Sequence, residues 1–320
     1  MDVKTAASTP GWETMGLSCR HVVRLCSGGF AVNRRPEWPL SSAPGRPLSD
    51  SALEGFDASD GSGADNGVEH PSRMRHNATV ARLRRKVTQG FPWAQPELDR
   101  KLAFFDGDHQ VLGRVWASSG YSRHAPKGNQ LDWALVQVRP DRRGANVLPA
   151  AEAWASKYVE LPESSPPNFP NPRTLGATLR PRGGTSLKTA SAGRPVRVFG
   201  VGAASGVICG TFSHVKSAIK IGGDGYRSDR GPAGERRGHA SWEYFYVEAR
   251  IDYGRHWPST QGDCGAVVFD QHGAALGLVF GGQIVPRQSR QPLAYVTPIE
   301  DVFEDIKSSS QGKILDIRVA

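Results

Sequence analysis

Short runs of apolar and β-branched residues, separated by glycine, proline and aspartate, recur along the chain and predict strands rather than long helices. The first half contains LAFF, QVLGRVWASSG and DWALVQV, all after Lys101. The second half contains RPVRVFGVG, SGVICGTFSHVKSAIKI, SWEYFYVEA, GAVVFD, AALGLVFGG and AYVTP. Short strands at hairpin spacing favour an all-β barrel or sandwich over a parallel α/β sheet.

Two segments have a helical period instead. In the first, Asn77 is the predicted cap and Gly90 the stop, with apolar residues along one face at Val80, Leu83 and Val87. The basic residues of this segment lie mostly off that face, so we interpret them as a solvated surface.

A second helix is expected after AYVTP. Thr297 can cap it, Pro298 suits its first position, and Glu300 completes a capping box. Its apolar stripe consists of Ile299, Val302, Phe303 and Ile306.

The distribution of polar and proline-rich stretches suggests domain boundaries. Residues 1–150 are expected to form an N-terminal barrel with a disordered insertion near 28–75, which is rich in Ser, Pro, Gly and Asp. Residues 151–194 form a proline-rich connector, because its prolines cannot enter a central sheet. Residues 195–308 are expected to form a C-terminal barrel with its closing helix, followed by a tail at 309–320.

Composition narrows the class of protein. The chain has 320 residues, 38% of them hydrophobic, with 37 glycines and 23 prolines, which fits a cored protein with many turns. Its formal charge of +9 is spread over many segments without an aromatic-interleaved basic motif, so a nucleic-acid partner is disfavoured.

Cellular location is predicted from what the sequence lacks. No run of eighteen apolar residues and no apolar leader of signal-peptide type occur, so we expect an intracellular, cytoplasmic protein that does not cross a membrane. The four cysteines, at 19, 26, 209 and 264, are too scattered for a disulfide framework and are expected to be free thiols.

Cys264 is the strongest candidate for chemistry. It lies in TQGDCGAVVFD, between Gly262 and Gly265, at the kind of glycine-framed turn that presents a nucleophile and lets backbone N–H groups converge on an oxyanion. Without that frame, a free cysteine is more often a small buried residue than a nucleophile.

Gly-Asp-Cys-Gly followed by AVVFD, QHG and ALGLVFGG resembles the nucleophile region of the chymotrypsin-like peptidases, in which serine usually occupies the position of Cys264. That family orders its triad as His, Asp and nucleophile. LSCRHVV resembles its His box and LDWALVQV its Asp box. The resemblance implies His21 as general base and Asp132 as the group that orients the imidazole.

The resemblance also implies the architecture: two six-stranded β-barrels and a C-terminal helix. GVGAASGVICG resembles an early hairpin of the second barrel, and the helix directly after AYVTP is most similar to intracellular trypsin-like proteins of fungi. Only 20 residues precede His21, whereas the family builds several strands before its His box. An incomplete first barrel is therefore left open.

The remaining site residues follow from the same resemblance. Gly262 and Cys264 would supply the oxyanion-hole N–H groups, and Phe280, Gly281 and Gly282 would bind the substrate backbone as an added strand. The implied partner is a peptide or protein substrate. Neither a cofactor, a metal nor a membrane partner is expected, and the sequence leaves the oligomeric state undetermined.

Other residues compete for these roles. His124 in YSRHAPKG is an alternative base, and Ser259 an alternative nucleophile without a glycine frame. Cys19, His21 and Cys26 contain zinc-ligand types, but no paired CxxC accompanies them.

Three functions therefore stay open from the sequence. The first is an endopeptidase that forms an acyl-enzyme on Cys264. The second is a catalytically inactive protein of the same fold that binds peptides or proteins. The third is a basic module that binds nucleic acid.

Overall fold

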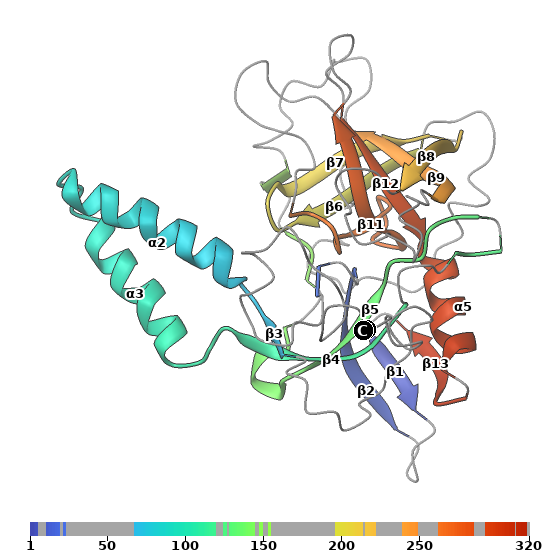
Figure 1. Ribbon diagram of the computed structural model, residues 1–320, viewed down its shortest axis with the longest axis horizontal. Coiled ribbons are helices and arrows are strands. Elements are labelled where there is room, and N and C mark those ends of the chain that lie inside the picture. The colour runs from blue at the N-terminus through green and yellow to red at the C-terminus, as the bar shows by residue number, and fades with distance from the viewer. Residues whose placement is uncertain are drawn as a thin grey trace, which may run out of the picture.

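In the described part of the chain, the fold consists of two antiparallel sheets, a pair of helices and a single helix near the C-terminus (Figure 1). A computed structural model describes residues 1–5, 11–19, 22–23, 67–119, 124–126, 128–144, 147–149, 153–154, 196–213, 215–221, 239–248, 262–284, 292–310 and 312–318. The predicted all-β class is confirmed, and so is the helix near the C-terminus.

The first sheet has six strands in the order β13-β1-β2-β5-β4-β3. These strands are β1 (Asp2–Thr5), β2 (Trp12–Ser18), β3 (Gly67–Glu69), β4 (Val111–Ser118), β5 (Ala134–Val138) and β13 (Ile314–Arg318). Residues 309–320, interpreted as a tail from the sequence, thus contain the strand that pairs with β1. Only β1 and β2 precede His21 among the described strands, and β13, from the other end of the chain, completes this edge of the sheet.

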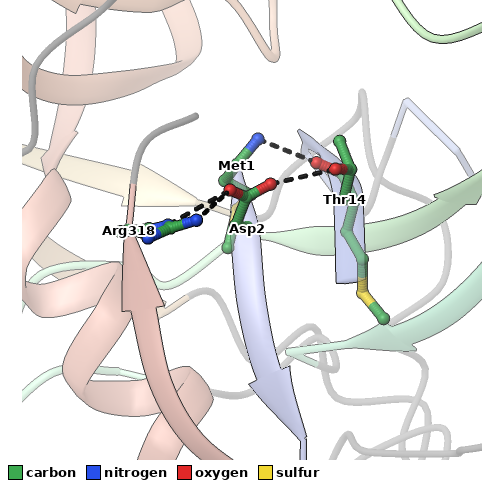
Figure 2. Close-up of polar contacts among 5 residues, drawn as sticks. Met1, Asp2, Thr14 and Arg318 are labelled. Carbon is green, nitrogen blue, oxygen red and sulfur yellow. Dashed lines mark hydrogen bonds and ion pairs between the residues drawn. The ribbon is translucent and has the colours of Figure 1, made fainter. Parts of the chain in front are cut away.

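Polar contacts fasten the first strand to both of its neighbours (Figure 2). The two carboxylate oxygens of Asp2 accept separate bonds, one from the Thr14 hydroxyl at 2.9 Å and the other from the Arg318 guanidinium at 3.1 Å. The Met1 amine donates to the Met15 carbonyl at 3.0 Å, and burial lowers the pKa of that amine. The register of β1 between β2 and β13 is thereby fixed.

The second sheet has the order β12-β11-β10-β6-β7-β9-β8, and β12 also pairs with β9. Six of its strands therefore close into a barrel, to which β8 is attached at β9. The strands are β6 (Val196–Gly202), β7 (Gly206–Phe212), β8 (Ser217–Ile221), β9 (His239–Glu248), β10 (Val267–Phe269), β11 (Ala275–Ile284) and β12 (Pro292–Pro298).

One apolar core joins the two sheets and the closing helix α5 (Ile299–Ser309). Leu135 from the first sheet, Leu278 from the second and Val302 from α5 belong to one buried cluster, and each is fully inaccessible to solvent. Burying such side chains is the main favourable term for docking the sheets, at roughly 1.5–3 kcal/mol for each large aliphatic residue.

A pair of antiparallel helices, α2 (Arg73–Thr88) and α3 (Ala94–Asp106), extends away from the two sheets (Figure 1). Val80 and Leu83 of α2 pack against Leu98 and Leu102 of α3. The prediction of a strand at LAFF is therefore wrong, because Leu98 and Leu102 lie four residues apart on one helical face. Among the described helices, none is both long and apolar enough to cross a membrane.

Both predicted helix caps are also wrong. Helix α2 begins earlier than expected, because the Ser72 hydroxyl accepts a bond from the Arg75 N–H at 3.4 Å and takes the role given to Asn77. Helix α5 has Pro298 at its cap position, and the Thr297 hydroxyl instead donates to the Gln130 carbonyl at 2.9 Å.

The described residues include only small parts of the predicted insertion and of the predicted connector. The predicted insertion near 28–75 lies outside the described residues except for residues 67–75, which contain β3 and the start of α2. From the predicted connector, Trp154 is described: it is fully buried and makes edge contacts with Phe199 and Phe269. A short 3-10 turn, η2 (Pro140–Arg142), follows β5.

Truncating Leu83 to alanine should loosen the helix pair without unfolding the sheets, since Leu83 is buried between α2 and α3. We expect the amides of α2 and α3 to lose about 2–4 kcal/mol of protection against hydrogen exchange. Met74→Ala is the matched control, because Met74 is 63% exposed on the same helix. Equal loss of protection in the sheet amides would contradict a separate core for the helix pair.

Candidate active site

The turn that carries Cys264 is held in a conformation that only glycine tolerates well. Gly262 and Gly265 have φ angles of 117° and 91°. The Ala266 N–H donates to the Asp263 carbonyl at 3.0 Å, which closes the turn around Cys264. Cys264 is partly exposed, whereas Asp263 beside it is buried. The thiol is therefore presented by a tight turn, as the glycine frame predicts.

The carbonyl of Val279 on β11 connects this turn to the first sheet. It accepts the Gly265 N–H at 2.8 Å and the Cys19 thiol at 3.1 Å. The Val279 N–H in turn donates to the Ala266 carbonyl at 2.9 Å. One residue of the second barrel thus binds both the Cys264 turn and the residue that follows β2.

The turn and the end of β2 also pack tightly together. A Cβ atom added to Gly265 would lie 2.6 Å from the Ser18 hydroxyl and 3.3 Å from the Cys19 nitrogen, so no larger residue fits there. Cys19 is two residues before His21. His21 itself lies outside the described residues, and its predicted role as base stays a prediction.

Cys19 is unsuited to nucleophilic chemistry. It is fully buried, and burial raises the pKa of its thiol well above the usual range. The nearby Asp132 carboxylate and Cys264 thiol raise that pKa further. Cys19 therefore stays a protonated thiol that donates to Val279, and its pKa responds to the charges of both Asp132 and Cys264.

Asp132 is fixed through its two neighbours in sequence. Ser119, at the end of β4, donates its hydroxyl to the Leu131 carbonyl at 3.1 Å. The same hydroxyl accepts the Trp133 N–H at 3.1 Å, while the Ser119 N–H donates to the Trp133 carbonyl at 2.9 Å. Leu131 and Trp133 are buried, so the backbone on both sides of Asp132 is immobilised.

The same loop is anchored to the second barrel and to α5. The Asn129 amide donates to Asp301 at 3.0 Å and accepts from the Lys216 ammonium at 2.5 Å. The Trp133 indole N–H donates to Asp305 at 2.8 Å. These contacts join the Asp132 loop to residues more than 80 positions away in sequence.

Glu243 is a further, fully buried member of this anchor. It is fully inaccessible to solvent, and one of its carboxylate oxygens accepts the Gln130 N–H at 2.7 Å. Burial raises the pKa of Glu243, against the opposing effects of that hydrogen bond and of the Lys216 charge.

A second anchor holds the Cys264 turn through the Asp263 carboxylate. One Asp263 carboxylate oxygen accepts the Ala204 and Ser205 N–H groups at 2.7 and 3.0 Å, and the other accepts the Ser205 hydroxyl at 2.5 Å. A Cβ atom on Gly202 would collide with this carboxylate. The hairpin between β6 and β7 therefore clamps Asp263, and with it the backbone of Gly262 and Cys264.

Phe280, Gly281 and Gly282 lie on β11, directly after Val279, which binds the Cys264 turn. Gly281 and Gly282 pair with Tyr295 and Ala294 of β12, and a register shift falls at Phe280, which packs on Tyr295. Pairing of β11 with β10 ends at Leu278 among the described strands. Their predicted contact with a substrate backbone is not tested by these observations.

The competing candidates are placed in part. His124 forms an isolated antiparallel bridge with Gln130, on the loop that leads to Asp132. Ser259 and Cys26 lie outside the described residues. Within the described part of the chain, no cluster of three or more His, Cys, Asp or Glu side chains could hold a metal ion.

Comparisons with known proteins return structural similarity alone. No family model matches the chain, and no curated protein matches its sequence. Among solved structures, a glutamic-acid-specific serine protease is 13% identical, with 66% of this chain and 74% of that chain covered and a TM-score of 0.32. Cellulomonas bogoriensis chymotrypsin is 14% identical, with 66% of this chain and 84% of that chain covered and a TM-score of 0.29.

Thermobifida fusca protease A is also similar, with 14% identity, coverage of 64% of this chain and 76% of that chain, and a TM-score of 0.31. Because sequence identity and TM-score are low in all three comparisons, they carry no argument about function.

Three anchoring residues, Ser119, Ser205 and Glu243, are not predicted from the sequence. Ser119 and Ser205 sit among small residues in ASSG and AASG, where serine is common and carries no distinctive signal. Glu243 lies inside an apolar strand, in SWEYFYVEA, and a charged residue at an inward position is the one signal that could have drawn attention to it.

Replacing Gly265 by alanine should destabilise the protein by about 1–3 kcal/mol, because of its positive φ and the collision with Ser18. Gly281→Ala is the matched control on β11, since the nearest atom to an added Cβ lies 3.8 Å away. We expect it to stay within about 0.5 kcal/mol of the parent protein. Urea denaturation measures both, and equal losses would count against a strained turn.

Glu243→Gln should become favourable relative to the parent protein as the pH rises. The folded-state pKa of Glu243 is raised, so its stabilising contribution is complete below its ordinary pKa and is lost as the pH rises through the raised value. Glutamine can still accept the Gln130 N–H without titrating. Urea denaturation from acid to neutral pH measures the difference, and a pH-independent difference would contradict the assignment.

Proposed function

We propose that the protein is an endopeptidase-type hydrolase in which Cys264 is the nucleophile, His21 the general base and Asp132 the residue that orients His21. The observation that carries the proposal is the shared Val279 carbonyl. It binds both the nucleophile turn and Cys19, and Cys19 lies two residues before His21 and is electrostatically coupled to Asp132.

The oxyanion hole is assigned to the N–H groups of Gly262 and Cys264. In the turn, the N–H groups of Gly265 and Ala266 are used by Val279 and Asp263. None of the hydrogen bonds among the described residues uses the N–H of Gly262 or Cys264. Two preorganised donors of this kind are what stabilises a developing oxyanion, and losing one typically costs about 100- to 1,000-fold in rate.

The proposed reaction passes through a thioester. His21 accepts the Cys264 proton as sulfur attacks the carbonyl carbon, and then donates that proton to the departing amine. Water, deprotonated by His21, next attacks the thioester, which releases the acid and restores the thiol. Cysteine needs less activation than serine because a fraction of it is already thiolate near neutral pH.

The substrate backbone is assigned to the edge of β11 formed by Phe280, Gly281 and Gly282. Pairing with β10 stops just before these residues among the described strands, and an extended peptide could continue the sheet there. The two glycines leave room for its side chains. Kinship with intracellular fungal trypsin-like proteins, and a location inside the cell, stay predictions.

Alkylation by iodoacetamide, followed by peptide mapping, tests the nucleophile and its base. Cys264 should react faster than Cys19 and Cys209, which are buried. His21→Ala should slow labelling of Cys264 at neutral pH by about tenfold or more, because the imidazole no longer assists thiolate formation. Cys264→Ala should abolish hydrolysis of a quenched fluorescent casein.

His124→Ala is the matched control, because His124 lies on the loop that leads to Asp132 and is not the proposed base. This substitution should leave the labelling rate unchanged. If His124→Ala slows labelling and His21→Ala does not, the assignment of the base is wrong. Fast, His21-dependent labelling without any hydrolysis of casein would overturn the peptidase and support the inactive, peptide-binding alternative.

A further inference from the structure

The loop between α2 and α3 forms the apex of the helix pair, far from the two sheets (Figure 1). Two large aromatic side chains are exposed there, Phe91 at 40% and Trp93 at 56%. Pro92 between them is exposed as well. Exposed aromatics are ordinary when scattered singly, but two that lie together on an apex form a small apolar surface aimed at solvent.

The charge on the α2 side of this apex has one sign, and the nearest carboxylate on the α3 side, Glu97, pairs with Arg100 and Lys101. From residue 70 to residue 96 the sequence has no Asp or Glu. The same stretch contains the basic residues Arg73, Arg75, Arg82, Arg84, Arg85 and Lys86. Arg73 pairs with Glu69 and Arg75 donates to the Ala203 carbonyl, so these two serve the base of the helix pair.

The remaining four basic residues lie in the last two turns of α2, next to the apex. Arg82, Arg84 and Arg85 are exposed, and Lys86 lies over the Phe91 ring at 4.3 Å. Arg82 is six residues before the end of α2, which is roughly 9 Å along the helix axis. An anionic partner that meets the aromatic apex would therefore also meet these cations.

The ring geometry favours a lipid surface over a nucleic-acid strand. Stacked bases need open, separated aromatic faces. Phe91 and Trp93 instead contact each other, with centroids 6.1 Å apart and planes tilted by 56°, and Lys86 covers one face of Phe91. A convex apex suits a flat surface, and tryptophan with neighbouring basic residues is the combination found at membrane–water interfaces.

We propose that the apex of the α2–α3 helix pair binds the surface of membranes that contain anionic lipids. Phe91 and Trp93 enter the headgroup region, and Arg82, Arg84 and Arg85 pair with lipid phosphates and carboxylates. The contact is peripheral and spans nothing. It does not depend on the peptidase activity proposed above.

Vesicle sedimentation of the full chain tests the proposal. We expect binding to vesicles of phosphatidylcholine and phosphatidylserine, little binding to phosphatidylcholine alone, and weaker binding at high salt. Phe91→Ser with Trp93→Ser should weaken binding by about tenfold or more, because their burial in the headgroup region is lost. The triple variant R82Q/R84Q/R85Q should weaken it by roughly 100-fold.

Each variant has a matched control outside the apex. R114Q/R139Q/R143Q removes the same net charge from three arginines of the first sheet and its adjoining turn, all exposed. Trp12→Ala removes a tryptophan that is 39% exposed on β2. Both controls should bind like the parent protein. Circular dichroism of every variant confirms that the helices have formed.

A second readout locates the contact. Brominated lipids should quench the tryptophan fluorescence of the parent protein, and Trp93→Phe should still bind while losing that quenching. The proposal is overturned if no vesicle binds, if phosphatidylcholine alone binds equally, or if the control triple variant weakens binding as much as the apex triple variant. Tighter, apex-dependent retention of single-stranded RNA or DNA would assign the apex to nucleic acid instead.

Discussion

The arrangement of the candidate site depends on one acceptor, the carbonyl of Val279. It accepts the Gly265 N–H from the Cys264 turn and the Cys19 thiol from the residue after β2. Because Cys19 is fully buried, its thiol has no water to replace that partner. The acceptor thereby joins the first sheet to the second at the point where the proposed base from one and the proposed nucleophile from the other would have to meet.

Two sets of hydrogen bonds position different parts of the site. The Ser205 hairpin holds Asp263 and the adjoining backbone of the proposed oxyanion hole, entirely within the second barrel. Glu243 and Ser119 hold the Asp132 loop, which belongs to the first sheet but is bound by the second barrel. Movement between the sheets would therefore separate Asp132 from Cys264 only after breaking buried hydrogen bonds, each of which is costly to leave unmade.

The sequence predicts the local features well. Alternating apolar runs locate nearly all strands of the second barrel, and the glycines around Cys264 predict its turn. Features that depend on distant partners escape it. Residues 314–318 (ILDIR) form a strand because β1 lies beside them. Glu243 anchors the Asp132 loop because it accepts the Gln130 N–H. The Thr297 hydroxyl could have capped α5, but it donates to the Gln130 carbonyl instead.

The central claim is that His21, Asp132 and Cys264 meet at one place. Nitrogen NMR shifts of the His21 ring test it most directly, because they report which nitrogen carries the proton. The account predicts one dominant tautomer, with Nδ1 protonated toward Asp132, that is lost in Asp132→Asn and retained in Asp141→Asn, an exposed control. A His21 ring that averages between tautomers in all three proteins would contradict the account.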